Sequence, residues 1–514
     1  MNKDLRGKKV LILQQRGWAI TIGHNLAKKL KQEGCELIAV TLKRDTYDFI
    51  VNQKDVNYEA IVSIDDIMED PEKVLAGEDI SLEKICSDLG IDTIWPFIYS
   101  NRLLVYSYRE KYYYSYRQNV SDEFMVNYVK AYYKSLRDLF EKFKPDVVFL
   151  AAFISDIHAI LNLLAKKYGI PTVSIINTRI DDFHVFTGSC YNESGEFFDY
   201  LKSLNNSKIE GKNKDRARKY IDEFRANFKK PWDLVDHLKQ VNTKKSWKKI
   251  IRHELSPYYH SLMWYFQDSS KNYIKSIGST LDYRTPRVIL RDFYGYKRYR
   301  KAMENFKYYP LEKIGKCVYF PLQFQPEGAI DYMATFFSNQ IEVARLIAMS
   351  LPGDYTLMVK DHPGMLGYRS PSYLEKIFRT PNIKLIDYRI PTELILKKAD
   401  LVLSPNSTTL LEAAFLNKPA IQFGNMGTTL ELPNVIKHTD FTTLSSKIKE
   451  RLSLNLISDD YERKLENYVT AIFDTGFDIN YSRIWEKGKK MSDDFLIDKL
   501  IGKIAEVINK SKNA

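Results

Sequence analysis

The chain has 514 residues, of which 44% are apolar and 28% are charged. This composition is ordinary for a soluble globular protein, and the length excludes a single ordinary hydrophobic core, so two or three domains are expected. The formal net charge of +12 makes anionic partners plausible, namely membrane phospholipid, nucleic acid or phosphorylated substrates, although charge spread over many helices is mostly a solvated surface.

The four cysteines, Cys35, Cys86, Cys190 and Cys317, lie far apart, and no two of them form a C-x-x-C pair. This spacing argues against a zinc cluster or a disulfide framework and favours reduced thiols. The N-terminus lacks the layout of a signal peptide, and the longest apolar run, 146–154, is too short to span a bilayer. We therefore expect a cytoplasmic protein, with any membrane contact being peripheral and at the inner face of the cell membrane.

The first part of the chain alternates strands and helices. Strands are predicted at 8–14, 36–42, 146–153 and 170–176, and amphipathic helices at 19–34 and 157–169. Such alternation predicts a parallel sheet that is covered by helices on both faces. A Tyr-rich helical insert over about 97–143 interrupts this pattern, and residues 208–275 are predicted to form basic helices.

A second series of strands and helices begins near residue 315. Its predicted strands cover 316–323, 355–363, 383–387, 399–405 and 418–424, and its predicted helices cover 338–351, 407–417 and, at the C-terminus, 494–510. The fold class is therefore α/β, with two Rossmann-like domains that face a central cleft and carry helical insertions. The predicted divisions are an N-terminal Rossmann-like acceptor domain (1–205), a helical basic connecting region (206–312), a C-terminal Rossmann-like domain (313–475) and C-terminal helices (476–514) that can cross back to the first domain.

Three polar clusters follow strands of the second half, at 321–328, 360–364 and 404–409. Because the carboxyl ends of parallel strands share one edge of a sheet, and ligands bind at that edge, the three clusters should converge. In the last cluster Asn406 or Ser407 is a natural helix N-cap, and the first-turn N–H groups with the neighbouring hydroxyls suit a phosphate. A well-capped helix without a ligand explains this segment at least as well.

The middle cluster places His362 directly before a proline. Pro363 biases His362 toward an extended conformation, so the imidazole should point off the sheet edge into the cleft. There it can donate a hydrogen bond to a phosphate oxygen, while Lys360 or Asp361 contacts ribose or base. For an isolated His-Pro pair, a polar turn is the simpler interpretation.

The three segments together resemble those of the bacterial capsular polysaccharide biosynthesis family, a group of GT-B glycosyltransferases. The family's "Q-P", "H-P" and "S-x-x-x-x-E" segments correspond to Gln325-Pro326, His362-Pro363 and the run from Ser404 to Glu412. The resemblance is best over about 315–425, whereas the N-terminal half matches only in its general layout. Members of this family include transferases that move Kdo (3-deoxy-manno-octulosonic acid) from CMP-Kdo.

The resemblance implies a nucleotide-sugar site in the second half. His362 would bind the donor phosphate and stabilise charge on the leaving nucleotide, and Ser407 and Thr408 would bind the same phosphate or the ribose. The other implied residues are Gln325, Glu327, Lys360, Ser404, Asn406, Thr409 and Glu412, although Glu412 is nearly as plausible as a structural helix residue. No Asp-x-Asp occurs in the sequence, so neither a metal nor another cofactor is expected.

Glycosyl transfer to a hydroxyl needs a base, or a carboxylate nucleophile if the anomeric configuration is retained. The candidates are Asp156, which follows a strand at the start of a helix, and Asp182. Helix N-capping explains Asp156 about equally well, and the segment around Asp182 lacks the Glu-x-Gly pattern expected of related enzymes, so the base stays unassigned. Acceptor contacts are predicted for Arg16, Gly17, His24 and Arg179, although His24 can equally face the packed side of its helix. Tyrosines between 106 and 133 either stack on sugar rings or pack helices together.

The leading hypothesis is a metal-independent GT-B glycosyltransferase for a capsule or lipopolysaccharide-type polymer. It would move Kdo or a nonulosonate from a CMP-sugar donor to a glycan or lipid-linked glycan acceptor. The alternatives are a UDP-sugar transferase and a CDP-glycerol glycerophosphotransferase. A basic protein that binds nucleic acid or a membrane surface is a further alternative, supported by the net charge and the segment 244–255, but no nucleic-acid-binding motif accompanies the charge, so nucleic acid is not expected as a partner.

Overall fold

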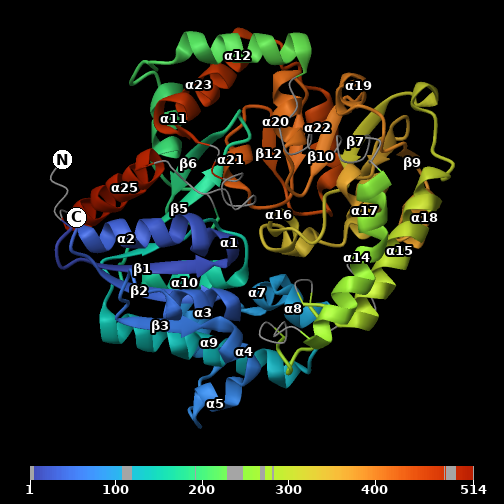
Figure 1. Cartoon of the computed structure of the whole chain (residues 1–514). Coiled ribbons are helices and arrows are strands. Elements are labelled where there is room, and N and C mark those ends of the chain that lie inside the picture. Colours follow the sequence, from blue (N-terminus) through green and yellow to red (C-terminus); the bar gives the residue numbers. More distant parts are fainter. Residues whose placement is uncertain are drawn as a thin grey trace.

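Figure 1 shows a computed structural model of the chain, which contains two sheets surrounded by helices. Both sheets are built mainly from parallel strands joined by helices, so the prediction of an α/β fold with two Rossmann-like halves is confirmed. The structure describes residues 5–106, 119–191, 193–228, 247–266, 273–280, 283–479, 481 and 494–512.

The first sheet has seven strands in the order β13-β6-β5-β4-β1-β2-β3. The five strands from β5 to β3 are parallel, whereas β6 pairs antiparallel with both β5 and β13. The sequence pattern did not predict these two antiparallel strands. The strands are β1 (Lys9–Gln15), β2 (Glu36–Leu42), β3 (Ala60–Ser63), β4 (Val147–Phe149), β5 (Thr172–Asn177), β6 (Phe183–Thr187) and β13 (Phe477–Asp478).

Helices of the first half lie on both sides of this sheet. The helix predicted over 19–34 begins with a π-helical turn, η1, which α2 continues and α1 precedes. The elements are α1 (Arg16–Trp18), η1 (Ala19–Gly23), α2 (His24–Gln32), α3 (Arg44–Asn52), α4 (Ile64–Glu69), α5 (Pro71–Leu75), α6 (Leu82–Leu89), α7 (Trp95–Ser100), α8 (Arg102–Val105), α9 (Asp122–Phe143), α10 (Asp156–Lys167), α11 (Glu196–Asn205) and α12 (Lys214–Asn227).

The Tyr-rich insert supplies α9, the longest helix of the first half. Its residues Tyr128, Tyr132 and Tyr133 are almost completely buried in the core of the first half. They therefore pack the helix against its neighbours, while residues 107–118, which hold most of the Tyr-rich run, lie outside the described residues.

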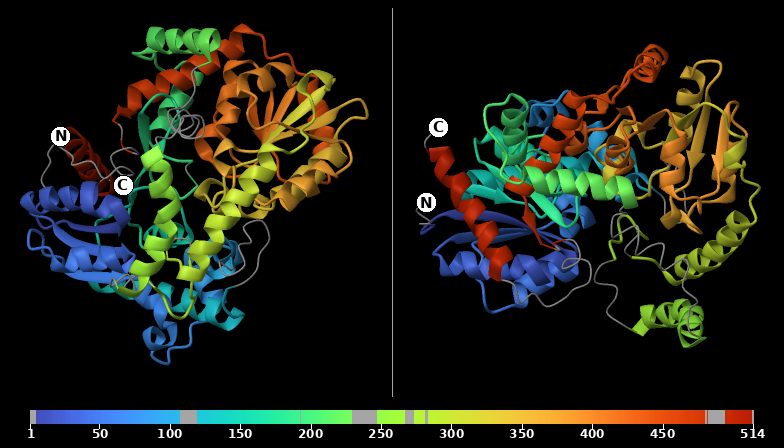
Figure 2. Two further views of the ribbon diagram at one scale, coloured as in Figure 1. Left: turned by 45° about the vertical axis from the view of Figure 1, so that its right-hand side comes forward. Right: turned by 90° about the horizontal axis from the view of Figure 1, so that it is seen from above.

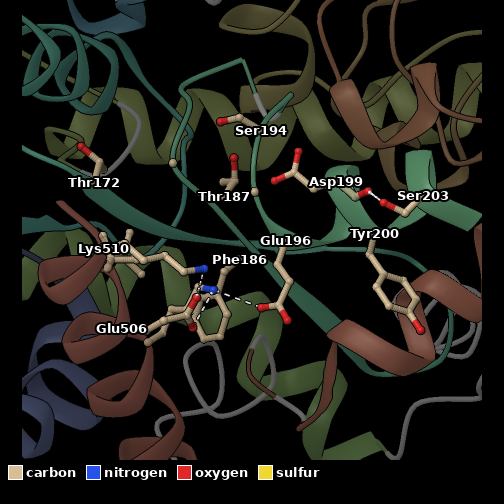
Figure 3. Close-up of a pocket in the computed structure, with 15 residues that line it drawn as sticks. Thr172, Phe186, Thr187, Ser194, Glu196, Asp199, Tyr200, Ser203, Glu506 and Lys510 are labelled. Atoms are coloured by element: carbon tan, nitrogen blue, oxygen red, sulfur yellow. Dashed lines mark hydrogen bonds and ion pairs between the residues drawn. The ribbon is translucent and has the colours of Figure 1, made fainter. Parts of the chain in front are cut away.

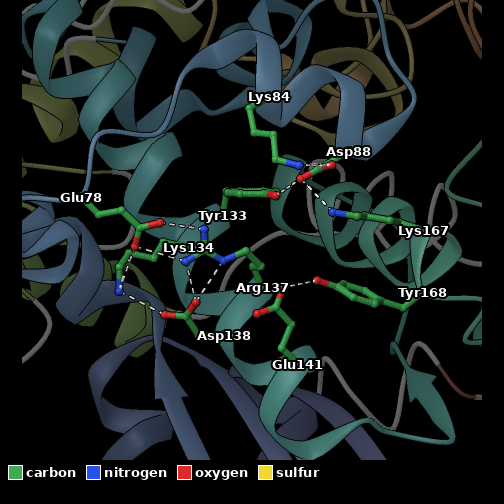
Figure 4. A network of polar contacts seen from close by, with 10 residues as sticks. All are labelled: Glu78, Lys84, Asp88, Tyr133, Lys134, Arg137, Asp138, Glu141, Lys167 and Tyr168. Carbon is green, nitrogen blue, oxygen red and sulfur yellow. Dashed lines mark hydrogen bonds and ion pairs between the residues drawn. The ribbon is translucent and has the colours of Figure 1, made fainter.

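A network of polar contacts holds the outer side of α9 (Figure 4). Arg137 donates to Glu78 at 2.8 Å and to Asp138, while Lys167 of α10 contacts Asp88 of α6 at 2.8 Å. The hydroxyl of Tyr133 also donates to Asp88. The insert is thus tied directly to the segment that holds Glu78 and to α6, which in turn is tied to α10, and it forms a structural layer of the first half.

The second sheet has six parallel strands in the order β12-β11-β10-β7-β8-β9. Every strand of this sheet therefore ends at the same edge. The strands are β7 (Cys317–Pro321), β8 (Thr356–Lys360), β9 (Ile383–Ile386), β10 (Leu401–Ser404), β11 (Ala420–Gln422) and β12 (Val435–Lys437). The helices around it are η3 (Leu311–Lys313), α16 (Gly328–Asp331), η4 (Thr335–Phe337), α17 (Gln340–Ser350), η5 (Pro363–Met365), α18 (Pro371–Phe378), α19 (Thr392–Lys398), α20 (Thr409–Phe415), α21 (Gly427–Leu430) and α22 (Leu444–Leu452).

Four further helices connect or cover the two halves: α14 (Trp247–Phe266), α15 (Pro286–Glu304), α23 (Asp459–Thr475) and α25 (Asp494–Lys512). Helix α23 packs against α11 and α12, and the C-terminal helix α25 returns to the first sheet, where it contacts α2, β4 and β5 (Figures 1 and 2). Of the helices that the structure describes, none combines the length and the apolar character needed to cross a bilayer.

Candidate functional site

The three polar clusters of the second half lie side by side at one edge of the second sheet. They follow β7, β8 and β10, and β7 lies between the other two strands. Because all three strands are parallel, their carboxyl ends point the same way. Ligands of open α/β sheets bind outside such an edge, which makes this the first place to look for a site.

A chain of buried hydrogen bonds joins the three clusters. Gln323, which follows β7, donates from Nε2 to Ser404 Oγ at 3.3 Å, and its carbonyl accepts from Arg369 Nη2 at 2.7 Å. Arg369 forms an ion pair with Asp361, whose Oδ1 accepts the backbone N–H of His362 at 2.8 Å. The turn that carries His362 is therefore fixed relative to the turn that begins at Ser404.

His362 begins the short helix η5 in an extended conformation, with φ −69° and ψ 128°. This is the geometry expected of a residue before proline. Its Nδ1 accepts the N–H of Gly364 at 3.1 Å, so the neutral ring carries its proton on Nε2. The ring is half-buried and meets Phe324 edge-on, with ring centroids 5.9 Å apart. The imidazole is thus held in one tautomer with Nε2–H as its donor.

The Asp361–Arg369 ion pair lies beneath this turn. Asp361 is fully buried and Arg369 is 3% exposed. Burial raises the pKa of Asp361, and the charge of Arg369 opposes that shift. Asp361 Oδ2 has no hydrogen-bond partner within the described part of the chain. Sequence reasoning missed Arg369, because nothing in its local pattern marks it as the partner of a residue eight positions earlier.

Local hydrogen bonds hold the turn after β10. Ser407 Oγ accepts the N–H of Thr409 at 3.1 Å, and both residues are buried, whereas Thr408 is half-buried. Asn406 donates to the carbonyl of Ala329 at 2.7 Å and accepts from Gln422 Nε2 at 2.9 Å. The N-cap of α20 is Thr408, without a side-chain cap bond, so the prediction that Asn406 or Ser407 caps this helix was wrong. Thr408 is also the hydroxyl of this turn with the most solvent contact.

Several other predicted donor-site residues point into the protein. Gln325 is 3% exposed, donates to the carbonyl of Ser338 at 2.9 Å and accepts from Gln340 at 2.7 Å. Lys360 Nζ donates to the carbonyl of Ile390 and to Thr392 Oγ1, both at 3.1 Å. Direct contact of either side chain with a ligand would require these bonds to break, so both are better placed to support the edge than to bind a ligand.

Glu327 and Glu412 differ in their surroundings. Glu412 of α20 is 5% exposed and its charge acts on the buried Tyr319, which fits the structural role foreseen for it. Glu327 is half-buried, and its N–H donates to Asp331 Oδ2 at 3.1 Å. Glu327 therefore stays among the residues that can reach a ligand.

At the carboxyl edge of the first sheet, Asp156 occupies the first turn of α10. It is 5% exposed and accepts a hydrogen bond from Asn101 Nδ2 at 2.9 Å. Burial raises the pKa of Asp156 to about 6, against the opposing hydrogen bonds of Asn101 and of the helix backbone. A carboxyl group that titrates near neutral pH can take up and release a proton under physiological conditions.

A second buried network lies beside Asp156. His158 Nε2 contacts Gln15 Oε1 at 2.9 Å, and its Nδ1 contacts Ser155 Oγ at 2.9 Å. Burial lowers the pKa of His158 to about 3, so the ring is neutral. The network joins the ends of β1 and β4, and neither Gln15 nor His158 was singled out from the sequence.

The two edges meet through the segment that follows β7. Arg102 Nη1 of the first half donates to the carbonyl of Pro326 at 3.3 Å, and the hydroxyl of Tyr332 donates to the carbonyl of Cys190 at 3.0 Å. A Cβ atom at Gly328 would lie 2.9 Å from the carbonyl oxygen of Ile154, which follows β4. The carboxyl edges of the two sheets therefore face one another, in contact at this point.

The remaining predicted residues lie around the first sheet. Arg16, exposed and with φ 44°, follows β1, and the carbonyl of Gly17 accepts from Thr21 Oγ1 at 2.8 Å. Arg179, with φ 64°, and Asp182 belong to the turn between β5 and β6. These four residues thus follow strands that end at the same edge as β4. His24 lies on α2 against α3, where Nε2 contacts Asp55 at 3.3 Å and the ring packs edge-on to Phe49.

A pocket of about 470 Å³ lies elsewhere, between β5, β6, α11 and α25 (Figure 3). Its lining includes Thr172 at the start of β5 and Thr187 at the end of β6, together with Lys503 and Glu196, which contact each other at 3.1 Å. None of the predicted site residues lines it. Within the described ranges, no group of three or more His, Cys, Asp or Glu side chains is placed to hold a metal ion.

Residues 228–427 match the family model described as capsule polysaccharide biosynthesis protein. The match includes the ends of β7, β8 and β10, and with them the buried chain from Ser404 to His362. No curated protein sequence matches the chain.

Solved structures to which the chain is similar include two that are described as KpsC of Thermosulfurimonas dismutans. The β-Kdo 2,7 transferase is 11% identical, with 72% of this chain and 89% of that chain covered at a TM-score of 0.33. The β-Kdo 2,4 transferase is 13% identical, with 71% and 94% covered, also at 0.33. The UDP-GlcNAc 2-epimerase of Methanocaldococcus jannaschii is 12% identical, with 87% and 93% covered at a TM-score of 0.22. Likenesses at this level do not bear on activity.

Proposed function

We propose that this protein is a glycosyltransferase of cell-surface polysaccharide biosynthesis. It transfers Kdo or a nonulosonate from a CMP-sugar donor to a glycan or lipid-linked glycan acceptor, without a metal ion, at the cytoplasmic face of the cell membrane. The family match over 228–427 supports the link to capsule synthesis. The sequence resemblance supports the CMP-sugar and Kdo chemistry.

The observation that carries the proposal is the chain of buried hydrogen bonds from Ser404 through Gln323, Arg369 and Asp361 to the backbone of His362. It holds the imidazole and the Thr408 turn at one edge, separated by the strand β7. Preorganised donors stabilise charge that develops in a transition state, because they need not be reoriented during the reaction. A phosphate leaving group at this edge would accept from His362 Nε2–H.

The facing edge supplies a base. In the proposed reaction the acceptor hydroxyl oxygen attacks the anomeric carbon of the donor sugar while the bond from that carbon to the CMP phosphate oxygen breaks. The hydroxyl proton passes to the carboxylate of Asp156, and the negative charge of the departing CMP is stabilised by His362. Burial raises the pKa of Asp156 to about 6, which is close to the value that suits a base at neutral pH. Asp182, also at this edge, is the other candidate base.

A panel of donors tests this function directly. The full chain is incubated with an acceptor glycan and with CMP-Kdo, a CMP-nonulosonate, UDP-sugars or CDP-glycerol, and nucleotide release is measured with and without EDTA. We expect release of CMP that EDTA does not change. Release of UDP would favour a UDP-sugar transferase, and release of CMP from CDP-glycerol alone would favour a glycerophosphotransferase. Loss of activity with EDTA would contradict metal independence.

Binding of CMP provides a second readout that is independent of the acceptor. Calorimetric titration of the wild type with CMP should show binding, and His362→Ala should weaken it, because the variant loses the phosphate donor. If the wild type and the variant bind CMP equally well, His362 does not contact the donor phosphate, even if the wild type transfers a sugar.

A further inference from the structure

Helix α14 presents an unusual surface. Nine of its side chains are large, apolar or aromatic and strongly exposed, with exposed fractions from 46% at Tyr258 to 77% at Phe266. The nine are Trp247, Ile250, Ile251, Leu255, Tyr258, Tyr259, Leu262, Tyr265 and Phe266. Contiguous exposed apolar surface of this kind marks an interaction site in a folded protein, whereas single exposed apolar residues need no explanation.

These side chains form one stripe along the helix. At 100° per residue, all of them except Ile250 fall within an arc of about 120°. The half-buried residues Pro257 and Trp264 lie on the opposite side of the helix. This is the pattern of an amphipathic helix, whose apolar face is normally buried. In α14 the apolar face is exposed to solvent instead.

Helix α14 is attached to the rest of the protein through α15. Glu254 forms an ion pair with Lys297 of α15, and the rings of His253 and Tyr258 pack on Phe293, with centroids 6.2 and 6.3 Å away. The right-hand view of Figure 2 shows α14 at the edge of the molecule, beyond α15 and away from both sheets. This position leaves the stripe accessible to a large, flat partner.

The charge around the stripe is strongly positive. The 39 residues of α14 and α15 contain nine Lys and Arg against three Asp and Glu, so this pair of helices carries half of the net charge of the chain. Two of the cations are exposed beside the stripe: Lys248 lies within the arc, in the first turn of the helix, and Arg252 borders the arc. An anionic partner is therefore favoured over a neutral one.

We propose that α14 docks this protein on an anionic phospholipid membrane, with the apolar stripe inserted at the boundary between headgroups and acyl chains. A helix with a Trp-, Tyr- and Leu-rich face and Lys and Arg beside it is suited to that boundary. Nucleic acid would use the cations but not the aliphatic residues Leu255, Leu262 and Ile251. A second copy of the chain would bring two clusters of like charge together.

The experiment is flotation of the full chain with vesicles. Vesicles of phosphatidylcholine containing about one third phosphatidylglycerol are compared with vesicles of phosphatidylcholine alone. We expect binding to the anionic vesicles that is at least about tenfold stronger and that weakens at high salt, since each basic residue near the surface adds attraction. Binding to neither kind of vesicle would overturn the proposal.

Two variants locate the contact. Leu255→Ser, Leu262→Ser and Phe266→Ser combined should reduce binding at least about tenfold, because the inserted area is lost. Ile457→Ser is the matched control, since Ile457 is 79% exposed but belongs to the segment between α22 and α23 rather than to α14, and should bind as the wild type does. Circular dichroism and a melting temperature within about 2 °C of the wild type would verify that the triple variant is folded.

Other occupants of the stripe would give different results. If the wild type is dimeric, the triple variant is monomeric and neither floats with vesicles, a second copy covers the helix and the proposal is wrong. If the wild type binds a short single-stranded RNA but not the vesicles at the same salt concentration, the surface belongs to nucleic acid. A triple variant that floats as well as the wild type would also overturn the proposal.

Discussion

The two facing sheet edges hold their buried carboxyl groups in different ways. At the second sheet, Asp361 is fully buried and paired with a buried Arg369, so its negative charge is met by a positive one. At the first sheet, Asp156 is also buried, but its side-chain partner is the neutral amide of Asn101. The first arrangement fixes a charge, whereas the second leaves a group whose pKa of about 6 lies near physiological pH.

This difference suggests a structural role for the Asp361–Arg369 pair and a chemical role for Asp156. A buried ion pair resists the loss of either partner, because the remaining charge would be left without compensation. A desolvated carboxyl group with neutral partners is a poor source of stability but can exchange a proton at neutral pH. We therefore expect changes at the second edge to affect folding through Arg369, and changes at Asp156 to affect turnover with little loss of stability.

The largest effect is expected for Asp156→Asn. The amide keeps the shape and the hydrogen bond to Asn101 but cannot accept the proton, so turnover should fall by about 10²- to 10⁴-fold. In the wild type, kcat should rise with pH through about 6, following ionisation of Asp156, and this rise should be absent in the variant. Asp182→Asn is the control, and a greater loss in that variant would transfer the role of base to Asp182.

The stability of the same variant gives a check that does not depend on activity. Because burial raises the pKa of Asp156 above its ordinary value, the native state binds its proton more tightly than the unfolded state does. This contribution to wild-type stability is present at low pH and is lost as pH rises from about 4 to about 6. Asp156→Asn should therefore be as stable as the wild type, or more stable, at pH 8. Strong destabilisation at that pH would show that the carboxylate has a structural partner.

The second prediction concerns Arg369→Met, which should lower the free energy of unfolding by about 3–5 kcal/mol because it strands the Asp361 carboxylate in the interior. Chemical denaturation measures the loss. Adding Asp361→Asn to Arg369→Met should recover most of it, since no uncompensated charge then remains. Arg389→Met is the matched control: Arg389 pairs with Asp387 but its side chain is 61% exposed, so its loss should cost less than about 1 kcal/mol. If both variants lose the same free energy of unfolding, burial of the Asp361–Arg369 pair does not set its contribution to stability.

These two residues also mark what the sequence can and cannot predict. Asp156 was found because it follows an apolar strand and opens a helix, which are local signals. The extended geometry of His362 was likewise predicted from the proline beside it. The pairing of Arg369 with Asp361 was not predicted, because it depends on how a loop folds back over the sheet edge and leaves no periodic signal.

The same distinction applies to the fold. Most of the parallel strands were predicted, because each is a short apolar run between polar segments, but the parallel strands β3 and β12 were not predicted. Strands β6 and β13 were missed, since β13 has two residues and its partner β6 lies almost 300 residues earlier in the chain. For α9, helical spacing left open whether Tyr128, Tyr132 and Tyr133 bind sugars or pack, and burial settles that they pack.

The third prediction is that His362→Ala lowers turnover by about 10²- to 10³-fold, the usual cost of removing one donor to a developing negative charge. The ring is half-buried and Asp361 keeps its bond to the backbone N–H, so the melting temperature should change little. His260→Ala, an exposed histidine on α14, is the control and should turn over at the wild-type rate in a soluble assay. If His362→Ala keeps its turnover within a few-fold of the wild type, His362 does not stabilise the leaving phosphate and the nucleotide-sugar site does not lie at this edge.

The smallest effect tests whether the two edges act together. Gly328 approaches Ile154 so closely that a Cβ atom there would lie 2.9 Å from a backbone oxygen, which cannot move as a flexible side chain would. Gly328→Ala should therefore push the two edges apart, at a cost of about 1–3 kcal/mol, typical of overpacking. A displacement of this kind between donor and base lowers kcat, since reacting groups must be held at close distance. Gly353→Ala, where the added methyl group meets nothing within 4 Å, should change neither stability nor kcat. If Gly328→Ala loses stability but keeps the wild-type kcat, the contact is only structural, and Asp156 and His362 do not act across it.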